Sequence, residues 1–567
     1  MRSALRTCAT AVAAAAALSA CLGDDDNDVL PQLAEASGTS LKSCAALTTA
    51  FSFANTSLTA ASDVAAGTLT VAGKAVPAHC LVTGSMYPRT GVNGNYAIGF
   101  EMRLPAAWNG RFFYQANGGA DGNVVTATGG IGGGGSLSHA LAMGFAVISS
   151  DAGHNAAQNA AGTAHFGNDP QARLDFGYQA VAKLTPMAKG LIASAYGKGP
   201  DRSYIGGCSN GGRHTMVAAA RYPEQYDGFL VGNPGTNLPK AATANIAGFQ
   251  KYLTLASTAG DASTGFTLAE RSTVSNAVLA KCDALDGASD GLIQDTTACQ
   301  AAFDLNRDVP TCSGARDGSC LTTAQKTVIA QLFAGAQTST GAKIYASWPY
   351  DNGFATAGWS FWKFTVPNIL DSVAVGQIFQ SPPETAAGFV GPVFAATGSV
   401  DAMVSKIAAT SGNFSESSLS FMTPPNPSDL SKLKQRGAKL MLFHGTADPI
   451  FSSDDSTAWY ESLISANAGN AAAFARFYRV PGMGHCSGGP STDQFDMLSS
   501  LVAWVEKGQV PGAITASARG AGNAGGANAD VPAGWSATRT RPLCAYPQVA
   551  RYNGSGSLEE AASFTCR

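Results

Sequence analysis

Charged residues are scarce in this sequence. Asp, Glu, Lys and Arg make up 13% of its 567 residues, and the net charge is −3. This balance gives no sign of a nucleic-acid-binding surface, and no internal repeat is visible in the sequence. Hydrophobic residues reach 45%. The chain can therefore build a large core, either in two or three domain-sized units or in one large α/β domain with an insertion.

The apolar run near the N-terminus is too short to cross a bilayer. Ala9–Leu18 follows a basic start, and a transmembrane helix needs ~20 apolar residues. The run leads into LSAC, which ends at Cys21 and looks like a bacterial lipobox. We therefore predict a lipoprotein-type signal peptide over 1–20, lipidation of Cys21 and a flexible tether over 21–40. An ordinary cleaved signal with a chance cysteine is the alternative. The protein is expected to be exported, either anchored in the outer membrane or periplasmic or extracellular.

Export makes disulfide bonds plausible. Once the signal peptide and Cys21 are set aside, ten cysteines remain, an even number that is consistent with five bridges. Sequence alone does not fix how they pair. They are Cys44, Cys80, Cys208, Cys282, Cys299, Cys312, Cys320, Cys486, Cys544 and Cys566.

Strand-like and helix-like segments alternate in two parts of the chain. This alternation predicts an α/β fold with a mostly parallel, doubly wound sheet. We expect strands within 96–116 and at 144–149, 203–206, 439–443 and 473–480, and helices at 171–195, 211–221 and 494–507.

The region 236–430 differs from its surroundings. It is rich in Ser, Thr, Ala and Gly, and it holds four of the ten remaining cysteines. Because the β/α alternation resumes after it, we interpret it as a large lid domain inserted into a catalytic domain that comprises 41–235 and 431–567. A tandem domain is the alternative.

A serine within a G-x-S-x-G frame is the first candidate for chemistry. Ser209 lies in the stretch YIGGCSNGGR, between a predicted strand and a predicted helix. A nucleophile elbow requires this context, because a strained turn exposes the hydroxyl at the helix N-terminus. Cys208, directly before it, is a second possible nucleophile.

A serine hydroxyl needs a base, and the base needs a carboxylate to orient it. Asp448 follows one predicted strand and His485 follows the next, so both lie where active sites of open α/β sheets collect. The chain order Ser, Asp, His is that of α/β-hydrolases. We predict the triad Ser209, Asp448 and His485. We interpret His444 as structural and His214 as packed or exposed.

The cysteines beside the predicted nucleophile and base form a natural pair. Cys208 precedes Ser209, and Cys486 follows His485. If serine and histidine touch, their neighbours come within the ~4.4–6.8 Å that a disulfide spans between Cα atoms. We predict a Cys208–Cys486 bridge, which leaves Ser209 as the nucleophile. Two free buried thiols are the alternative.

From about residue 41 to the C-terminus, the chain resembles the tannase/feruloyl esterase family of α/β-hydrolases. Within that family it is most similar to the branch that hydrolyses terephthalate monoesters. The resemblance implies an α/β-hydrolase fold with a lid and a serine esterase that hydrolyses esters of aromatic carboxylic acids. Its strongest stretches are NGRFF, GCSNGGR, CDALDGASDGLI, PGMGHCSGGP and TRTRPLCAY.

The same resemblance implies further site residues. The oxyanion hole would be formed by the backbone N–H groups of Gly119 and Asn210. The Asn117-Gly118-Gly119 turn also follows an apolar strand, which suits a donor loop. No organic cofactor is implied. The remaining bridges implied are Cys44–Cys80, Cys282–Cys299, Cys312–Cys320 and Cys544–Cys566.

Three carboxylates crowd the loop that begins at Cys282. Such crowding is repulsive unless a cation neutralises it, and carboxylate oxygens suit Ca²⁺. The resemblance implies a structural Ca²⁺ site in the lid; a solvated acidic turn is the alternative. The implied ligands are the side chains of Asp283, Asp286 and Asp290 and the carbonyls of Ala288 and Leu292.

Arginine is absent between Arg316 and Arg436. Terephthalate-monoester hydrolases of the family use a lid arginine to hold the free carboxylate of the substrate. The lid does carry the family's aromatic stretch, from which we expect Trp362 to stack on an aromatic acid. Lys363 is the only basic residue in 344–405. The missing arginine argues against specificity for terephthalate monoesters. The expected substrate is thus either a terephthalate monoester or a hydroxycinnamate (feruloyl) ester.

A tannase-type gallate esterase is the alternative activity. A non-catalytic binding protein on a hydrolase fold and a serine peptidase are further ones. The expected partner is a small aromatic ester, with no nucleic acid, no membrane contact except a lipid anchor, and a monomeric state.

Overall fold

The computed structural model describes residues 30–131, 137–159, 164–385 and 387–567. A nine-stranded sheet forms its centre, in the order β13-β12-β11-β10-β8-β9-β6-β5-β2. Neighbouring strands from β13 to β9 pair in parallel, and the last three pair antiparallel. The strands are β2 (Thr56–Val64), β5 (His79–Gly91), β6 (Gly94–Pro105), β8 (Arg111–Gln115), β9 (Ala146–Ser150), β10 (Arg202–Cys208), β11 (Gly228–Gly232), β12 (Lys439–Gly445) and β13 (Ala475–Val480).

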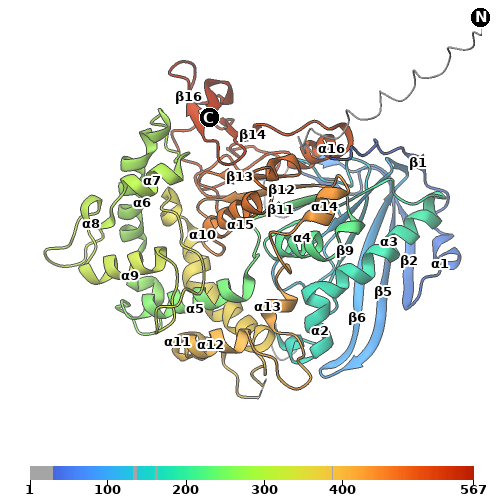
Figure 1. The fold of residues 1–567 in the computed structure, drawn as a ribbon, viewed down its shortest axis with the longest axis horizontal. Coiled ribbons are helices and arrows are strands. Elements are labelled where there is room, and N and C mark those ends of the chain that lie inside the picture. Colours follow the sequence, from blue (N-terminus) through green and yellow to red (C-terminus); the bar gives the residue numbers. More distant parts are fainter. Residues whose placement is uncertain (1–29, 132–136, 160–163, 386) are drawn as a thin grey trace, which may run out of the picture.

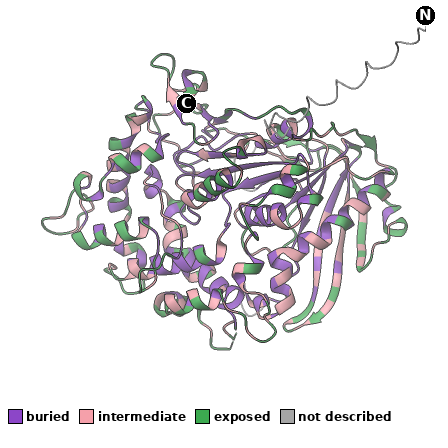
Figure 2. Cartoon of the chain, viewed as in Figure 1, coloured by how far each residue is buried: buried purple, intermediate pink, exposed green. Residues whose placement is uncertain are grey.

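Helices cover both faces of the parallel part of the sheet. Leu440 and Leu442 of β12 pack into the core that contains α3 (Ala180–Tyr196), α4 (Asn210–Arg221) and α15 (Ser453–Ala466). Met441 and Phe443 of the same strand pack into a second core with α16 (Met497–Lys507). This alternation is the two-residue period of a strand buried on both sides. In Figure 2 the parallel strands are accordingly almost wholly buried.

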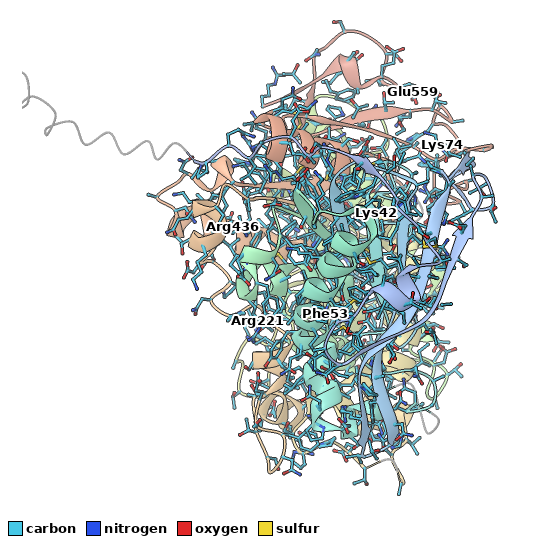
Figure 3. All side chains as sticks on the ribbon, turned by 90° about the vertical axis from the view of Figure 1, so that its right-hand side faces the viewer. Lys42, Phe53, Lys74, Arg221, Arg436 and Glu559 are labelled. Atoms are coloured by element: carbon cyan, nitrogen blue, oxygen red, sulfur yellow. A yellow bond between two sulfur atoms is a disulfide. The ribbon has the colours of Figure 1, made fainter. Side chains whose placement is uncertain are left out.

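All the predicted strands and helices form, with small differences at their ends. The helix expected over 171–195 is interrupted: α2 (Pro170–Leu174) continues through a π-helical turn at Asp175–Gln179 into α3. The antiparallel strands β2 and β5 were not predicted from the sequence. Figure 3 looks at this edge of the sheet, where Lys42 and Phe53 mark the segment before β2.

In the amino-acid sequence, the lid is inserted between two strands that are neighbours in the sheet. β11 and β12 pair directly with each other, although residues 233–438 separate them in the chain. This segment forms the green to orange helical part of Figure 1. Its longer helices are α5 (Leu238–Leu253), α6 (Leu268–Cys282), α9 (Thr323–Phe333), α11 (Gly391–Thr397) and α12 (Val400–Ile407), with π-helical turns η7 (Phe361–Thr365), η8 (Pro367–Asp371) and η9 (Ala374–Phe379).

The C-terminal segment bridges the sheet domain and the acidic loop of the lid. Arg539 donates to the carbonyl of Asp290 at 2.7 Å, and Arg541 forms an ion pair with the Asp290 carboxylate. The segment contains short strands at β14 (Ile514–Ser517), β15 (Thr540–Leu543), β16 (Ala550–Tyr552) and β17 (Phe564–Cys566).

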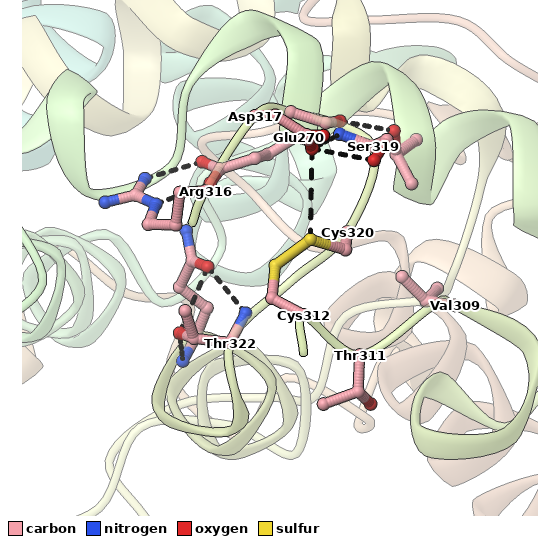
Figure 4. The surroundings of a disulfide bond; sticks show 12 residues. Glu270, Val309, Thr311, Cys312, Arg316, Asp317, Ser319, Cys320 and Thr322 are labelled. Carbon is pink, nitrogen blue, oxygen red and sulfur yellow. Dashed lines mark hydrogen bonds and ion pairs between the residues drawn. A yellow bond between two sulfur atoms is a disulfide. The ribbon is translucent and has the colours of Figure 1, made fainter. Parts of the chain in front are cut away.

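All five predicted disulfides form. Cys208–Cys486 joins residues 278 positions apart, and the other four close separations of 8 to 36 residues. The smallest loop, Cys312–Cys320, is braced by Arg316, which donates two hydrogen bonds to Glu270 (Figure 4). Five disulfides are typical of a protein exported to an oxidising compartment.

The tether prediction for 21–40 is wrong over its described part. Gln32 donates to the carbonyl of Val505 at 2.8 Å, and Glu506 accepts a hydrogen bond from the backbone N–H of Ala36 at 2.8 Å. These contacts hold the segment against the sheet domain. The predicted signal peptide and Cys21 lie outside the described residues. Within residues 30–567 as described, no helix combines the length and apolar character needed to cross a membrane.

Candidate active site

Ser209 occupies a sharp turn between β10 and α4. Its φ of 65° is a left-handed conformation that is strained for a side-chain-bearing residue. The turn presses close to the end of β8, because a Cβ atom at Gly207 would lie 2.3 Å from the carbonyl oxygen of Ala116, and one at Gly211 would lie 2.2 Å from it. The two glycines of the frame are therefore required by packing, as a nucleophile elbow demands.

The structure brings the three predicted triad residues into contact. The Oγ of Ser209 lies 2.8 Å from Nε2 of His485, and Nδ1 of His485 lies 2.8 Å from Oδ2 of Asp448. The carboxylate can only accept at neutral pH, so Nδ1 carries the proton and Nε2 is free to accept from the serine hydroxyl. Asp448 follows β12 and His485 follows β13, at the carboxyl ends of neighbouring strands.

Asp448 is buried and held from several sides. Its Oδ1 accepts from the backbone N–H groups of Ile450 (2.9 Å) and Phe451 (3.1 Å), and its Oδ2 accepts from Nδ2 of Asn233 at 2.7 Å. Burial by itself raises the pKa of Asp448, but His485 and His444 outweigh it and hold that pKa well below its usual range. The acid is thus ionised and fixed in orientation.

His444 and His214 are both buried. His444 donates from Nε2 to the carbonyl of Phe451 at 2.9 Å and accepts from Ser456 at Nδ1, 2.8 Å away. Its Nε2 also lies 3.3 Å from Oδ2 of Asp448, and its buried, fully bonded ring is in keeping with the structural role expected for it. His214 is 4% exposed and lies 2.8 Å from Asp121. Of the two alternatives for His214, the structure shows the packed one.

Cys208 is consumed by the disulfide to Cys486. The two Cα atoms are 6.1 Å apart, within the range a disulfide allows. Cys208 therefore has no free thiol to compete with Ser209. The bridge joins the turn that carries Ser209 to the loop that carries His485.

A cavity of 560 Å³ opens beside Ser209 and His485. Trp362 reaches it from the lid and packs edge-on against His485, with ring centroids 4.8 Å apart. Gly119 lines the cavity, and Asn210 is the first residue of α4, directly after Ser209. The lining residues are Gln115, Ala116, Asn117, Gly118, Gly119, Asp121, Asn123, Val125, Thr126, Thr128, Gly130, Ile131, His139, Cys208, Ser209, Trp362, His485 and Cys486.

The described lining of this cavity contains neither lysine nor arginine. The internal segments outside the description, 132–136, 160–163 and Ala386, contain none in the sequence either. Burial lowers the pKa of His139, which favours its neutral form. Lys363 points away into the lid, with Nζ 3.5 Å from the ring centroid of Trp348. The described lining therefore offers hydrogen-bonding groups but no fixed cation.

The acidic lid loop meets part of the requirement for a calcium site. Oδ2 of Asp286 is buried without a hydrogen-bond partner, and burial together with the charges of Asp290 and Asp283 raises the pKa of Asp286 to about 7. A cation would relieve both penalties. However, Asp290 is paired with Arg541, and across the described part of the chain no group of three acidic, histidine or cysteine side chains is arranged to hold a metal. The ligand set stays a prediction.

The fold and the site define an α/β-hydrolase, and comparison with known proteins agrees. The structure superposes on feruloyl esterase B from Aspergillus oryzae with a TM-score of 0.72 and 23% identity, covering 92% of this chain and 99% of the other. It superposes on a tannin acyl hydrolase from Aspergillus niger with a TM-score of 0.66 and 20% identity, covering 93% and 94% of the two chains. Such low identities speak for the fold alone.

Sequence comparison identifies the family. The family described as tannase and feruloyl esterase matches residues 80–567, and the chain belongs to it. The mono(2-hydroxyethyl) terephthalate hydrolase of Piscinibacter sakaiensis is 40% identical over 532 residues, which is 88% of this chain and 86% of that protein. The protein is a carboxylic ester hydrolase.

Sequence reasoning missed two polar residues that organise the site. Asn233 directly follows β11, and this place at the carboxyl end of a central strand is a signal that was available. Asp121, shortly after the Gly118-Gly119 turn, carried no distinguishing pattern. Its importance comes from contacts with α4, which only the folded chain creates.

Proposed function

We propose that Ser209 is the nucleophile of this esterase, His485 its general base and Asp448 the residue that orients the base. The observation that carries this proposal is the unbroken chain of two 2.8 Å contacts from Ser209 through His485 to Asp448. It starts at a strained elbow and ends at a buried, ionised carboxylate, as acyl transfer by a serine requires.

The proposed reaction has two halves. Ser209 Oγ attacks the ester carbonyl carbon while His485 Nε2 takes the hydroxyl proton, and the backbone N–H groups of Gly119 and Asn210 donate to the resulting oxyanion. His485 then returns the proton to the leaving alcohol, which leaves an acyl-Ser209 ester. Water, deprotonated by His485, attacks the carbonyl carbon of this ester. The bond from that carbon to Ser209 Oγ then breaks, His485 returns the proton to Ser209 Oγ, and the carboxylic acid is released.

The cavity favours an ester whose acid part is neutral and hydroxylated. Thr126, Thr128, Gln115 and neutral His139 offer hydrogen bonds, and Trp362 offers a face or edge to an aromatic ring. A free carboxylate would lose its hydration without meeting a cation. We therefore propose hydroxycinnamate esters as the preferred substrates, with gallate esters, which are also neutral and hydroxylated, as the alternative within the same chemistry.

Terephthalate monoesters are the second candidate. The observation in their favour is the 40% identity to a mono(2-hydroxyethyl) terephthalate hydrolase. Against them stands the absence of lysine and arginine from the described cavity lining.

One experiment decides between these substrates. We would compare kcat/KM for the release of ethylene glycol from mono(2-hydroxyethyl) terephthalate and from its methyl ester, in which a neutral methyl ester replaces the charged far carboxylate. Methyl ferulate and methyl gallate complete the panel. The neutral diester should be cleaved at least about tenfold faster than the monoester, since a bare carboxylate costs more than about 1.4 kcal/mol to desolvate. A faster reaction with the monoester would overturn the neutral-substrate proposal.

The control for the mechanism is Ser209→Ala, which should abolish turnover of every ester that the wild type cleaves. Retained turnover would remove Ser209 from its proposed role. A wild type inactive on all esters but able to bind them would favour the non-catalytic binding protein. Cleavage of peptides in preference to esters would favour the peptidase.

For the acidic loop we propose a structural Ca²⁺ held by Asp283, Asp286 and Asp290 with the carbonyls of Ala288 and Leu292. The support is chemical: the loop has hard oxygen donors and one orphaned carboxylate oxygen. No step of the proposed reaction involves the ion.

At the N-terminus we propose lipidation of Cys21. Intact-mass measurement of the membrane fraction from cells that make the wild type or Cys21→Ala tests it. We further propose that the enzyme is a monomer whose partner is a small aromatic ester, which sedimentation at assay concentration can check.

A further inference from the structure

A buried carboxylate links the two segments that would form the oxyanion hole. Asp121 lies in the loop after β8, two residues beyond Gly119. Its side chain is 2% exposed, and its backbone has a φ of 53°, a strained conformation for a non-glycine residue. Its Oδ2 accepts from Nδ2 of Asn210 at 2.9 Å and lies 2.8 Å from Nε2 of His214.

The hydrogen-bond roles in this cluster follow from the Asp121 carboxylate, which accepts. The imidazole proton is therefore on Nε2 of His214, 2.8 Å from Oδ2 of Asp121, while Nη2 of Arg213 lies 3.1 Å from both ring nitrogens. The Nε of Arg213 donates to Oδ1 of Asn210 at 2.6 Å. The side-chain amide of Asn210 is therefore fixed at both ends.

We propose that Asp121 is a positioning residue that sets the relative placement of the two oxyanion donors, the N–H groups of Gly119 and Asn210. Gly119 and Asp121 lie in the same loop. Asn210 is the first residue of α4, and Asp121 contacts this helix through its hydrogen bonds with Asn210 and His214. Stabilisation of an oxyanion depends on donors held at ~2.7–3.1 Å from the place where the charge develops. This inference rests on the proposed function.

A further contact also fixes the position of this loop. His154 lies 2.8 Å from the carbonyl oxygen of Ala120 through Nε2, and its ring stacks on Phe166 at a centroid distance of 3.6 Å. Burial raises the pKa of Asp121 to about 7, against the opposing effect of His154 and Arg213. Burying a carboxylate costs free energy. The partners that satisfy Asp121 lie on α4, the helix after the Ser209 turn, and not at the surface.

The test is Asp121→Asn, which keeps the shape but places an amide group where two donors already point. We expect kcat to fall by about 10- to 100-fold, within the range for a disturbed oxyanion hole. KM should stay within about threefold, since ground-state binding is untouched. Inactivation by an aryl phosphonate, which mimics the tetrahedral intermediate, should slow in parallel with kcat.

The matched control is Asp227→Asn. Asp227 is also buried and accepts from the N–H of Ser203 at 2.8 Å, at the amino ends of β10 and β11, opposite the strand ends that carry the site. Its loss should lower the melting temperature and leave kcat unchanged. An unchanged kcat in Asp121→Asn, in an enzyme whose turnover depends on Ser209, would overturn the positioning role and leave the proposed function standing. Ester turnover that survives Ser209→Ala would instead overturn the proposed function.

A second pair of variants decides the matter if Asp121→Asn does not fold. His214→Gln keeps a donor toward Asp121, whereas His214→Leu does not. We expect the glutamine variant to retain at least about tenfold more kcat than the leucine variant, the equivalent of one hydrogen bond to a charged group. Equal kcat values in the two variants would contradict the proposal.

Discussion

Four of the ten non-glycine residues with left-handed backbone conformations in the described part of the chain lie around Ser209 and its contacts. Asp121, Ser209, Asn233 and Cys486 have φ values of 53°, 65°, 35° and 64°. Each such residue costs on the order of 1–3 kcal/mol, which the surrounding structure must offset. Hydrogen bonds hold Asp121 and Asn233, a tight turn holds Ser209, and a disulfide holds Cys486.

At this scale we predict that Asn233 supports Asp448. Asn233→Ala removes the 2.7 Å hydrogen bond to Oδ2, so kcat should fall about tenfold, the cost of one hydrogen bond to a charged group, with KM unchanged. Steady-state kinetics on a cleaved ester measures both.

The control for this prediction is Asn233→Gly, which removes the same side chain and also relieves the strain at φ 35°. Both variants should lose the same kcat. If glycine restored wild-type kcat, backbone strain rather than the hydrogen bond would be responsible for the loss.

At the scale of elements, two loops at the carboxyl ends of β10 and β13 are joined covalently. The Cys208–Cys486 bridge closes a separation of 278 residues. The elbow and the base loop cannot move apart while it is intact, so the disulfide maintains the contact between Ser209 and His485.

Replacing both Cys208 and Cys486 with serine should therefore damage stability and turnover together. In the chain-entropy view a loop of this length contributes about 5 kcal/mol to the free energy of unfolding. Denaturant unfolding and kcat are the measurements.

Cys312→Ser/Cys320→Ser is the matched control for this variant. It opens a separation of 8 residues within the lid, should cost about 2–3 kcal/mol, and should leave kcat intact. A Cys208/Cys486 variant with wild-type stability and kcat would contradict the bracing role.

The acidic lid loop gives a prediction with a definite pH sign. Burial raises the folded-state pKa of Asp286 from 3.8 to about 7, so without metal its ionisation destabilises the fold increasingly as pH rises through this window. If Ca²⁺ binds there, it removes this cost. The melting temperature should therefore rise more on adding CaCl₂ at pH 8 than at pH 5.

Asp286→Asn is the control. It lacks the titrating carboxyl group, so its metal-free melting temperature should decline less between pH 5 and pH 8 than that of the wild type, and Ca²⁺ should affect it little. A wild-type melting temperature that did not respond to CaCl₂ at any pH would exclude the site.

At the scale of the whole molecule, a few buried polar contacts seat the lid on the sheet domain. Arg173 of α2 is 1% exposed and donates to the carbonyl of Gln377 (2.8 Å) and to Ser381 (3.2 Å), both in the lid. Its guanidinium lies 4.2 Å from the ring centroid of Phe414. Burial lowers the pKa of Arg173 to about 9. The carbonyl and hydroxyl groups accept hydrogen bonds from its guanidinium in place of a carboxylate.

Arg173→Met should loosen this junction. It leaves buried carbonyl groups unpaired, which costs about 1–3 kcal/mol each. We expect a lower melting temperature and faster amide hydrogen exchange in η9, while exchange in β10–β12 stays slow. Exchange raised uniformly over the whole chain would indicate global destabilisation rather than a specific lid junction.

The frame around Ser209 could be predicted from local patterns and chain order. A buried strand must be apolar throughout, a strained serine turn must be flanked by glycine, and the acid and base must follow neighbouring strands. Ser209, Asp448 and His485 could therefore be named from pattern and order. Cys208 and Cys486 could be paired because each adjoins a residue that must touch the other.

How that frame is supported and what the cavity offers depend on contacts between distant parts of the folded chain. Asn233, Asp121 and His214 act through partners from 89 to 215 positions away, and no local pattern encodes such contacts. The edge strand β2 also escaped prediction, since its side chains are largely exposed and lack clear alternation. Likewise, the sequence contains Lys363, but packing turns it toward Trp348. That side chain is therefore absent from the described lining of the cavity, which contains no other lysine or arginine.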